Sequence, residues 1–237
     1  MTTPSKRGKV VVIAGLIASG KSTLAAELAE AIKDALFLAE PDERDNANPY
    51  LGLFYGDKLR WPFTMQVHLL ALRFRQHQQA QWHAMNTGGV AVLDSSYFQD
   101  TCFARMLVKA GDMSPDEFTT YRTLYQAMTA SVLLPNVCIR VLVDPVAAQQ
   151  RLATRLEQRT GRAPEKVIDL GYLQALDHEI GHMVGTLRGL GVTTIDLPWD
   201  TERESPAQRA QTVRALAQRI LALEPVDLFL DLHRRTP

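Results

Sequence analysis

A glycine-rich segment between an apolar run and a helical stretch constrains this 237-residue chain more than any other feature. Residues 9–14 (KVVVIA) are short and rich in β-branched side chains, which is typical of a strand buried in a parallel sheet. Residues 15–22 follow directly and match the pattern G-x-x-x-x-G-K-[ST], and a segment rich in Ala, Leu and Glu comes next. A strand, this loop and a helix in that order indicate a phosphate-binding loop, or P-loop.

Each part of the motif suits it to bind an anion. Glycines let the backbone curl so that successive N–H groups point inward, and the helix adds the positive end of its dipole. Lys21 supplies a positive charge for the outer phosphates, and Ser22 offers a hydroxyl to Mg²⁺. The sequence therefore predicts a site for Mg²⁺ and ATP. We expect ATP to contact Gly15, Ala18, Ser19, Gly20, Lys21, Ser22 and Thr23.

The rest of the chain alternates between short apolar runs and longer segments with helical periodicity. Further strands are predicted at residues 35–39, 90–93, 138–143 and 192–197. Helices are predicted at residues 22–33, 65–85, 116–134, 145–159 and 205–223. This alternation predicts an α/β fold, with a five-stranded parallel sheet covered by helices on both faces. We expect one domain over residues 1–237, with 1–8 disordered and 224–237 forming a tail.

Composition excludes several classes of protein. Lys plus Arg and Asp plus Glu number 26 each, so the overall charge gives no reason to expect a nucleic acid partner. The apolar runs are far shorter than the roughly 20 residues of a membrane span, so no membrane association is expected. Two cysteines cannot build a disulfide framework, which favours a reducing, cytoplasmic location.

Two acidic residues stand directly after predicted strands. Glu40 follows the strand at 35–39, and Asp94 follows the strand at 90–93. In parallel α/β sheets, ligands bind outside the carboxyl ends of the strands, so both carboxylates are expected beside the P-loop. A carboxylate there can accept a proton from a substrate hydroxyl or help to hold a metal ion. We therefore expect Ser22, Glu40 and Asp94 to be the metal-binding group.

A longer pattern of residues begins at Glu40-Pro41. It comprises Asn48, Pro49, Tyr50, Leu51, Phe54, Tyr55, Arg60, Trp61, Phe63, Gln66 and Arg73, and continues through Asp94-Ser95-Ser96, Asp100, residues 103–125, Asp144-Pro145 and an arginine-rich segment with Glu165. Over roughly residues 9–185 the chain resembles the deoxynucleoside kinases, which include the deoxycytidine, deoxyguanosine and bacterial deoxyadenosine kinases. The resemblance implies a P-loop kinase fold with an arginine-rich lid, and a homodimer.

The resemblance also implies roles around the sugar of the substrate. Glu40 would be the general base that takes the proton of the 5′-hydroxyl. Tyr55 and Glu165 would bind the 3′-hydroxyl, and Trp61 would form part of the wall of the nucleoside site. Without the resemblance, Trp61 would be interpreted as a core residue.

Three polar residues would face the base of the nucleoside. Gln66 would pair with its edge, and Arg73 and Asp100 would bind its remaining polar groups. An ionised Asp100 can only accept hydrogen bonds, so it suits a base with an exocyclic amino group and repels the carbonyl of thymine. The expected acceptors are therefore deoxyadenosine, deoxyguanosine or deoxycytidine. Taken alone, Gln66 and Arg73 also fit a solvated helix face.

Arginines recur near the end of the fourth helical segment. Arg151, Arg155 and Arg159 are spaced by four residues, which places them on one face of a helix, and Arg162 follows. Fixed cations stabilise the charge of a transferring phosphoryl group. We expect Arg151 and Arg155 to be catalytic lid residues, and Arg155 and Arg159 to contact ATP. A solvated basic face is the alternative.

One position departs from the family pattern, which has Asp-Arg-Ser where this chain has Asp94-Ser95-Ser96. The missing arginine contacts the catalytic carboxylate in relatives. A charge-assisted hydrogen bond is worth about 1.5–3 kcal/mol, so its loss would cost roughly ten- to a few hundred-fold in rate. Either another cation compensates, such as Arg105 or a lid arginine, or the acceptor is a modified nucleoside or a nucleoside monophosphate, or the chain is a nucleotide-binding member with weakened catalysis.

A competing motif lies at residues 178–182, which read H-E-x-x-H. Two histidines four residues apart on a helix can bind zinc, with the glutamate as general base. The position at which a third histidine would fall is Arg188. We therefore favour the kinase over a zinc enzyme.

Overall fold

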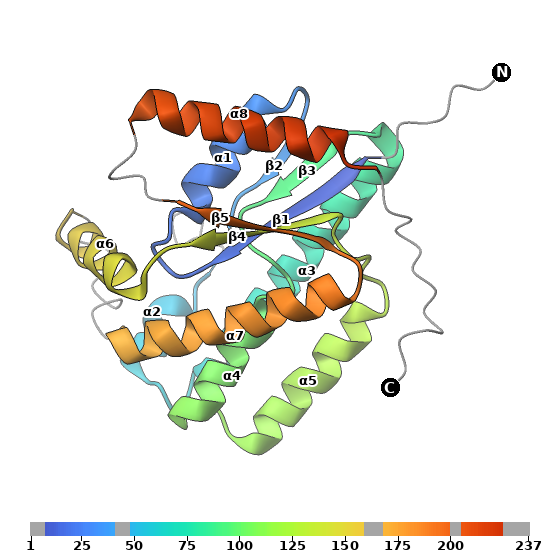
Figure 1. Cartoon of the computed structure of the whole chain (residues 1–237). Coiled ribbons are helices and arrows are strands. Elements are labelled where there is room, and N and C mark those ends of the chain that lie inside the picture. Colours follow the sequence, from blue (N-terminus) through green and yellow to red (C-terminus); the bar gives the residue numbers. More distant parts are fainter. Residues whose placement is uncertain (1–7, 41–47, 159–167, 200–204, 225–237) are drawn as a thin grey trace.

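A five-stranded parallel sheet forms the centre of the molecule (Figure 1). The computed structural model describes residues 8–40, 48–158, 168–199 and 205–224. The strand order is β2-β3-β1-β4-β5, and every neighbouring pair is parallel. The strands are β1 (Lys9–Gly15), β2 (Leu36–Leu38), β3 (Val90–Leu93), β4 (Val137–Leu142) and β5 (Thr193–Pro198). The prediction of a five-stranded parallel sheet is confirmed.

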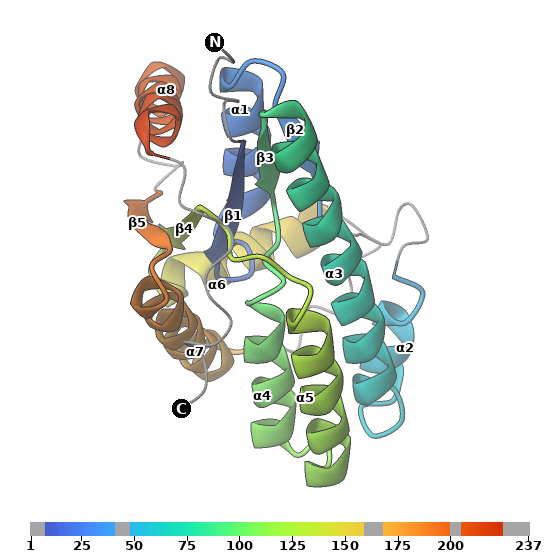
Figure 2. The same ribbon diagram turned by 90° about the vertical axis from the view of Figure 1, so that its right-hand side faces the viewer.

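Helices cover both faces of this sheet. Figure 2 shows α1 and α8 on one side, and α3, α4, α5 and α7 on the other. The helices are α1 (Lys21–Ala31), α2 (Leu51–Gly56), α3 (Pro62–Thr87), α4 (Asp100–Ala110), α5 (Pro115–Thr129), α6 (Pro145–Gln158), α7 (Leu170–Gly189) and α8 (Pro206–Ala222). Within the described residues, none of the helices combines the length and apolar character that crossing a bilayer requires.

The central strand β1 shows why its sequence is apolar without alternation. Val10, Val12 and Ala14 point into the core under α3, α4, α5 and α7. Val11 and Ile13 point to the other face, into the core under α1 and α8. Both faces of the strand are therefore removed from water, which is the environment of a parallel sheet between two helical layers.

The structure describes little of the two chain ends that we expected to be a disordered segment, 1–8, and a tail, 224–237. Gly8, which we expected to belong to a disordered segment, is buried and donates its N–H to the carbonyl oxygen of Ala84 (3.2 Å). Residues 1–7 and most of the expected tail, 225–237, lie outside the described part of the chain.

The helix predicted at residues 116–134 is shorter than its periodicity indicates. It begins at a capping box formed by Ser114 and Glu117, and α5 ends at Thr129. The following residues are drawn into tertiary contacts, since Val132 and Leu134 enter the core and Asn136 accepts the N–H of Val10 (2.7 Å). These contacts require an extended chain, so they override the local helical pattern.

His77 is a fully buried titratable residue in the middle of α3. Its Nε2 lies 2.8 Å from the carbonyl oxygen of Leu133, so this nitrogen carries the proton and donates it. The rings of Tyr97 and Phe98 pack around the imidazole. Burial lowers the pKa of His77 from 6.5 to about 4, although the bond to Leu133 opposes the shift. The folded protein therefore holds this histidine neutral.

The buried His77 predicts an acid-sensitive fold. Because the pKa is lower in the folded state, the unfolded chain binds the proton more readily, and the free energy of unfolding falls as pH decreases from about 6.5 to about 4. The loss attributable to this residue is about 3 kcal/mol. Urea denaturation at pH 7 and pH 4 should therefore show a smaller pH dependence for His77→Met than for the wild type. Equal pH dependence in both proteins would contradict the assignment.

Candidate active site

The P-loop follows β1 and has the backbone geometry of an anion-binding turn. Gly20, the N-cap of α1, has φ 89°, and a Cβ at this position would lie 2.9 Å from Nε1 of Trp199. Only glycine combines this left-handed conformation with such close packing. Ala18 also has a positive φ, of 60°. The loop is therefore held in one conformation, with the N-terminal turn of α1 directly behind it.

Lys21 folds back across the loop. Its ammonium donates a hydrogen bond to the carbonyl oxygen of Leu16 (2.7 Å). Burial lowers the pKa of Lys21, while the negative charges of Glu40 and Asp94 raise it. The lysine therefore lies within the electrostatic reach of both acids that were predicted from the strand ends.

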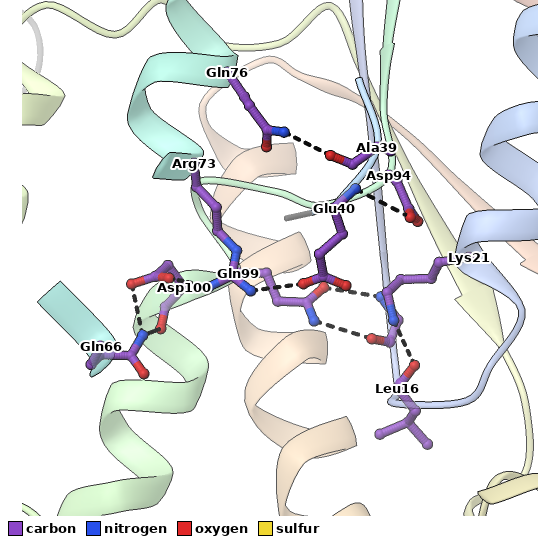
Figure 3. A network of polar contacts seen from close by, with 11 residues as sticks. Leu16, Lys21, Ala39, Glu40, Gln66, Arg73, Gln76, Asp94, Gln99 and Asp100 are labelled. Atoms are coloured by element: carbon purple, nitrogen blue, oxygen red, sulfur yellow. Dashed lines mark hydrogen bonds and ion pairs between the residues drawn. The ribbon is translucent and has the colours of Figure 1, made fainter. Parts of the chain in front are cut away.

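Gln99, just before α4, anchors the start of the P-loop. Its Oε1 accepts the N–H of Gly15 (3.0 Å), and its Nε2 donates to the carbonyl oxygen of Gly15 (3.1 Å; Figure 3). A glutamine can make this reciprocal pair because its side-chain amide has the same donor and acceptor as the backbone. The sequence analysis did not identify Gln99, since no local pattern marks a residue that bonds across 84 positions.

The carboxyl ends of β2 and β3 bring the two acids together. The N–H of Glu40 points to Oδ2 of Asp94 at 3.5 Å. Gln76 of α3 donates to the carbonyl oxygen of Ala39 (2.6 Å), so the helix also holds the end of β2 (Figure 3). The prediction that both acids would lie beside the P-loop is consistent with this geometry.

Asp94 has the character of a metal-binding carboxylate. Burial raises its pKa, a hydrogen bond with the hydroxyl of Ser22 lowers it, and the charge of Glu40 raises it further. Its Oδ1 is buried without a hydrogen-bond partner among the described residues. A hydroxyl and carboxylates are the hard oxygen ligands that Mg²⁺ prefers, so Ser22, Asp94 and Glu40 fit this ion.

The residues expected to face the base form one buried network. Arg73 donates from one nitrogen to Oδ1 of Asp100, and Gln66 donates from Nε2 to Oδ2 (2.8 Å) and to the carbonyl oxygen of the same residue (3.1 Å). Tyr121 of α5 donates its hydroxyl to Oδ2 (2.5 Å). Asp100 is fully buried, and these donors satisfy both of its oxygens. Tyr121 was not identified from the sequence, because its role depends on the packing of α5 against α3 and α4.

Arg73 also reaches Glu40. Its second terminal nitrogen lies 2.8 Å from Oε1 of Glu40 (Figure 3). Burial alone would lower the pKa of Arg73, but the charges of Asp100 and Glu40 raise it overall. The guanidinium therefore stays charged and joins the general-base candidate to the base-binding candidates.

Trp61 lies at the start of α3, half-buried. The guanidinium of Arg60 covers its ring at 4.6 Å, and Tyr50 lies 5.9 Å from it, between ring centroids. Tyr55 lies in the neighbouring short helix α2, but its side chain is outside the described part of the structure.

The predicted lid is described only in part. Arg151 lies on α6, which follows β4 and so starts at the same edge of the sheet as the P-loop. The side chain of Arg155 and all of Arg159, Arg162 and Glu165 are outside the described residues. Their roles stay predictions.

The H-E-x-x-H segment does not form a zinc-enzyme site. Glu179 is buried, accepts hydrogen bonds from Lys109 (2.7 Å) and Arg105 (3.2 Å) of α4, and has a pKa lowered first by Lys109. His178 and His182 are exposed. No group of three or more His, Cys, Asp or Glu side chains that could hold a metal ion occurs in the described residues. Because Arg105 is paired with α7, it is not the cation that contacts Glu40.

Comparisons with known proteins agree with this geometry. A model of the deoxynucleoside kinase family matches residues 11–218. The chain belongs to this family. This member is 31% identical over 211 residues to deoxyadenosine kinase of Dictyostelium discoideum, covering 89% of the chain and 80% of the relative. It is 32% identical over 171 residues to deoxyadenosine/deoxycytidine kinase of Bacillus subtilis, covering 72% and 74%. Its relatives are phosphotransferases, and so is this chain.

A solved structure shows the same fold. Deoxyadenosine kinase from M. mycoides with bound dATP superposes with a TM-score of 0.68 at 22% identity, covering 88% of this chain and 98% of that chain. The prediction of a P-loop kinase fold is confirmed.

The pair of bonds between Gln99 and Gly15 yields a prediction. Methionine has a volume similar to that of glutamine but cannot make the two hydrogen bonds to the N–H and carbonyl of Gly15. Gln99→Met should therefore lower the free energy of unfolding by about 1–3 kcal/mol. Because the P-loop loses an anchor, the KM for ATP should also rise. Gln126→Met, on the exposed face of α5, is the matched control for denaturation and kinetics. Equal effects of the two substitutions would contradict an anchoring role.

Proposed function

We propose that this kinase transfers the γ-phosphoryl group of ATP, with Mg²⁺, to the 5′-hydroxyl of a deoxynucleoside, and prefers deoxyadenosine, deoxyguanosine or deoxycytidine to thymidine. The observation that carries the proposal is the arrangement of Glu40. Its carboxylate stands at the carboxyl edge of the sheet, within the electrostatic reach of Lys21 of the P-loop, and is bonded to Arg73 of the base-binding network. One acid thus joins a phosphate site to a nucleoside site.

The phosphate side is formed by the P-loop and the first turn of α1. Backbone N–H groups from Gly15 to Thr23 would surround the phosphates, with Lys21 neutralising the outer ones. Ser22 and the carboxylates of Asp94 and Glu40 would hold Mg²⁺, which when bound supplies positive charge to the phosphate oxygens. Arg151, Arg155 and Arg159 would close over them from α6 and the lid.

The chemical step requires one proton acceptor. The 5′-oxygen forms a bond to the γ-phosphorus while the bond from that phosphorus to the bridging oxygen of ADP breaks, and Glu40 takes the hydroxyl proton. Tyr55 and Glu165 would bind the 3′-hydroxyl, and Trp61 would pack beside the nucleoside. Such positioning provides much of the rate in phosphoryl transfer, because the reaction needs little covalent help from the protein.

Base preference follows from the donors and acceptors in the buried network. The carboxylate of Asp100 accepts hydrogen bonds, whereas Arg73 donates, and Gln66 can do either. A base that presents an amino group beside a ring nitrogen complements this set, while the carbonyl of thymine would face a negative charge. The names of the relatives, which are deoxyadenosine and deoxyadenosine/deoxycytidine kinases, support the same preference.

A homodimer stays a prediction of the family resemblance, and a cytoplasmic location stays a prediction from the cysteine count. The exposed Trp82 and Met85 of α3 offer an apolar surface consistent with association of two copies.

Two substitutions test the proposed chemistry. Glu40→Gln removes the proton acceptor and should lower kcat about 10²- to 10⁴-fold, since general bases contribute by this amount. Lys21→Ala should abolish measurable turnover because the outer phosphates lose their cation. Glu30→Gln and Lys33→Ala, both exposed on or after α1, are matched controls that should keep wild-type rates. A Glu40→Gln enzyme with wild-type kcat would exclude the assignment of Glu40 as base.

The role of Asp100 is tested by comparing nucleosides. Asp100→Asn replaces a pure acceptor with a group that also donates, so kcat/KM for deoxyadenosine should fall about 10- to 100-fold, as expected for loss of one charged hydrogen bond. The value for thymidine should stay constant or rise. Steady-state kinetics with all four deoxynucleosides measure this, and a uniform loss would show that Asp100 does not select the base.

A further inference from the structure

One buried cation is shared by two carboxylates that have different expected tasks. Arg73 pairs with Asp100, whose side chain is fully buried, and with Glu40, whose side chain is 38% exposed. The arginine side chain itself is 6% exposed. The network thus runs from the closed interior to the edge of the sheet, with Arg73 in its middle.

The geometry of Arg73 is fixed from several sides. The planar guanidinium offers two nitrogens in a rigid fork, so binding one carboxylate directs the other nitrogen. Gln66 and Tyr121 hold Asp100 in turn. The ring of Phe103 lies 5.7 Å from the guanidinium carbon. Arg73 therefore cannot move without disturbing α3, α4 and α5 together.

The same helix also holds the backbone next to Glu40. Gln76, three residues after Arg73, donates to the carbonyl oxygen of Ala39 (2.6 Å). The approach of α3 to the end of β2 is therefore set at two points, one on the backbone and one on the carboxylate. This double attachment fixes the direction of the Glu40 side chain.

Position 95, where the family pattern has an arginine, is a serine in this chain and supplies no positive charge to Glu40. Ser95 is buried, and its hydroxyl has no hydrogen-bond partner among the described residues. Arg105, the other candidate on α4, is paired with Glu179. Within the described part of the chain, the guanidinium of Arg73 on α3 contacts Glu40.

We infer that Arg73 is a positioning residue for Glu40 as well as a group that binds the base, so that one guanidinium sets both nucleoside preference and turnover. The inference rests on the proposed function of Glu40 as the proton acceptor. A displacement of a catalytic group by about 1 Å can cost about 10²-fold in rate, so a fixed carboxylate has a measurable effect. If Arg73 only bound the base, its loss would raise the KM for the nucleoside and leave kcat at saturation unchanged.

A nucleoside without an amino group, assayed at saturation, tests the positioning role without the contact between Asp100 and the base. Purine 2′-deoxyriboside has no 6-amino group, so it offers Asp100 nothing to accept. Arg73→Met should lower kcat at saturation about 10²-fold with this nucleoside and with deoxyadenosine alike. Arg73→Lys keeps the charge without the fork and should give an intermediate kcat. Arg75→Met, an exposed arginine on the same helix, should leave both rates unchanged.

The outcome that would overturn the inference is an Arg73→Met enzyme with wild-type kcat on purine 2′-deoxyriboside and a raised KM for deoxyadenosine. The single variant leaves Asp100 buried without its cation, which can prevent folding. The double variant Asp100→Asn/Arg73→Met removes both charges, and Asp100→Asn alone retains Arg73. A kcat on purine 2′-deoxyriboside that is lower in the double variant than in Asp100→Asn supports positioning, and equal rates in the two variants overturn it.

Failure of this inference is distinguishable from failure of the proposed function. If Glu40→Gln is inactive while the Arg73 variants keep their kcat on purine 2′-deoxyriboside, Glu40 remains the base and only the positioning role is lost. If Glu40→Gln turns over at the wild-type rate, the proposed role of Glu40 itself is excluded.

Discussion

The two ion pairs of Arg73 are the interaction on which the rest of the site depends. A buried arginine without partners would be strongly destabilising, so α3 can pack only where its guanidinium meets the carboxylates of Asp100 and Glu40. That requirement fixes how α3 lies against the end of β2 and the start of α4. The same ion pairs therefore determine both how α3 packs on the sheet and where the side chains of the site lie.

Parallel topology supplies the second half of the site. Because β1, β2, β3 and β4 all run in one direction, the P-loop, Glu40, Asp94 and the start of α6 gather at one edge of the sheet. Asp94 leaves part of its hydrogen-bonding capacity unused, since its Oδ1 has no hydrogen-bond partner among the described residues. Buried groups of this kind are usual where a ligand or ion completes the set. The fold thus provides a polar edge for phosphates next to a buried network for a base.

Local patterns in the sequence were sufficient to predict the sheet, the P-loop, and the positions of Glu40 and Asp94 at the ends of strands. These features depend on residues that are neighbours in the sequence. Features set by contacts distant in sequence were not predictable. Tyr121 and Gln99 act through partners 21 and 84 positions away. The end of α5 is set by the core rather than by periodicity. Likewise, the H-E-x-x-H pattern is local in sequence, but the role of Glu179 is set by its distant partners Arg105 and Lys109 on α4.

The most direct test of the account is to identify the product formed from Mg²⁺-ATP and each of the four deoxynucleosides. The account predicts ADP together with a 5′-monophosphate, formed faster from deoxyadenosine, deoxyguanosine or deoxycytidine than from thymidine. Release of ADP without any phosphorylated nucleoside, or thymidine as the fastest acceptor, would contradict it.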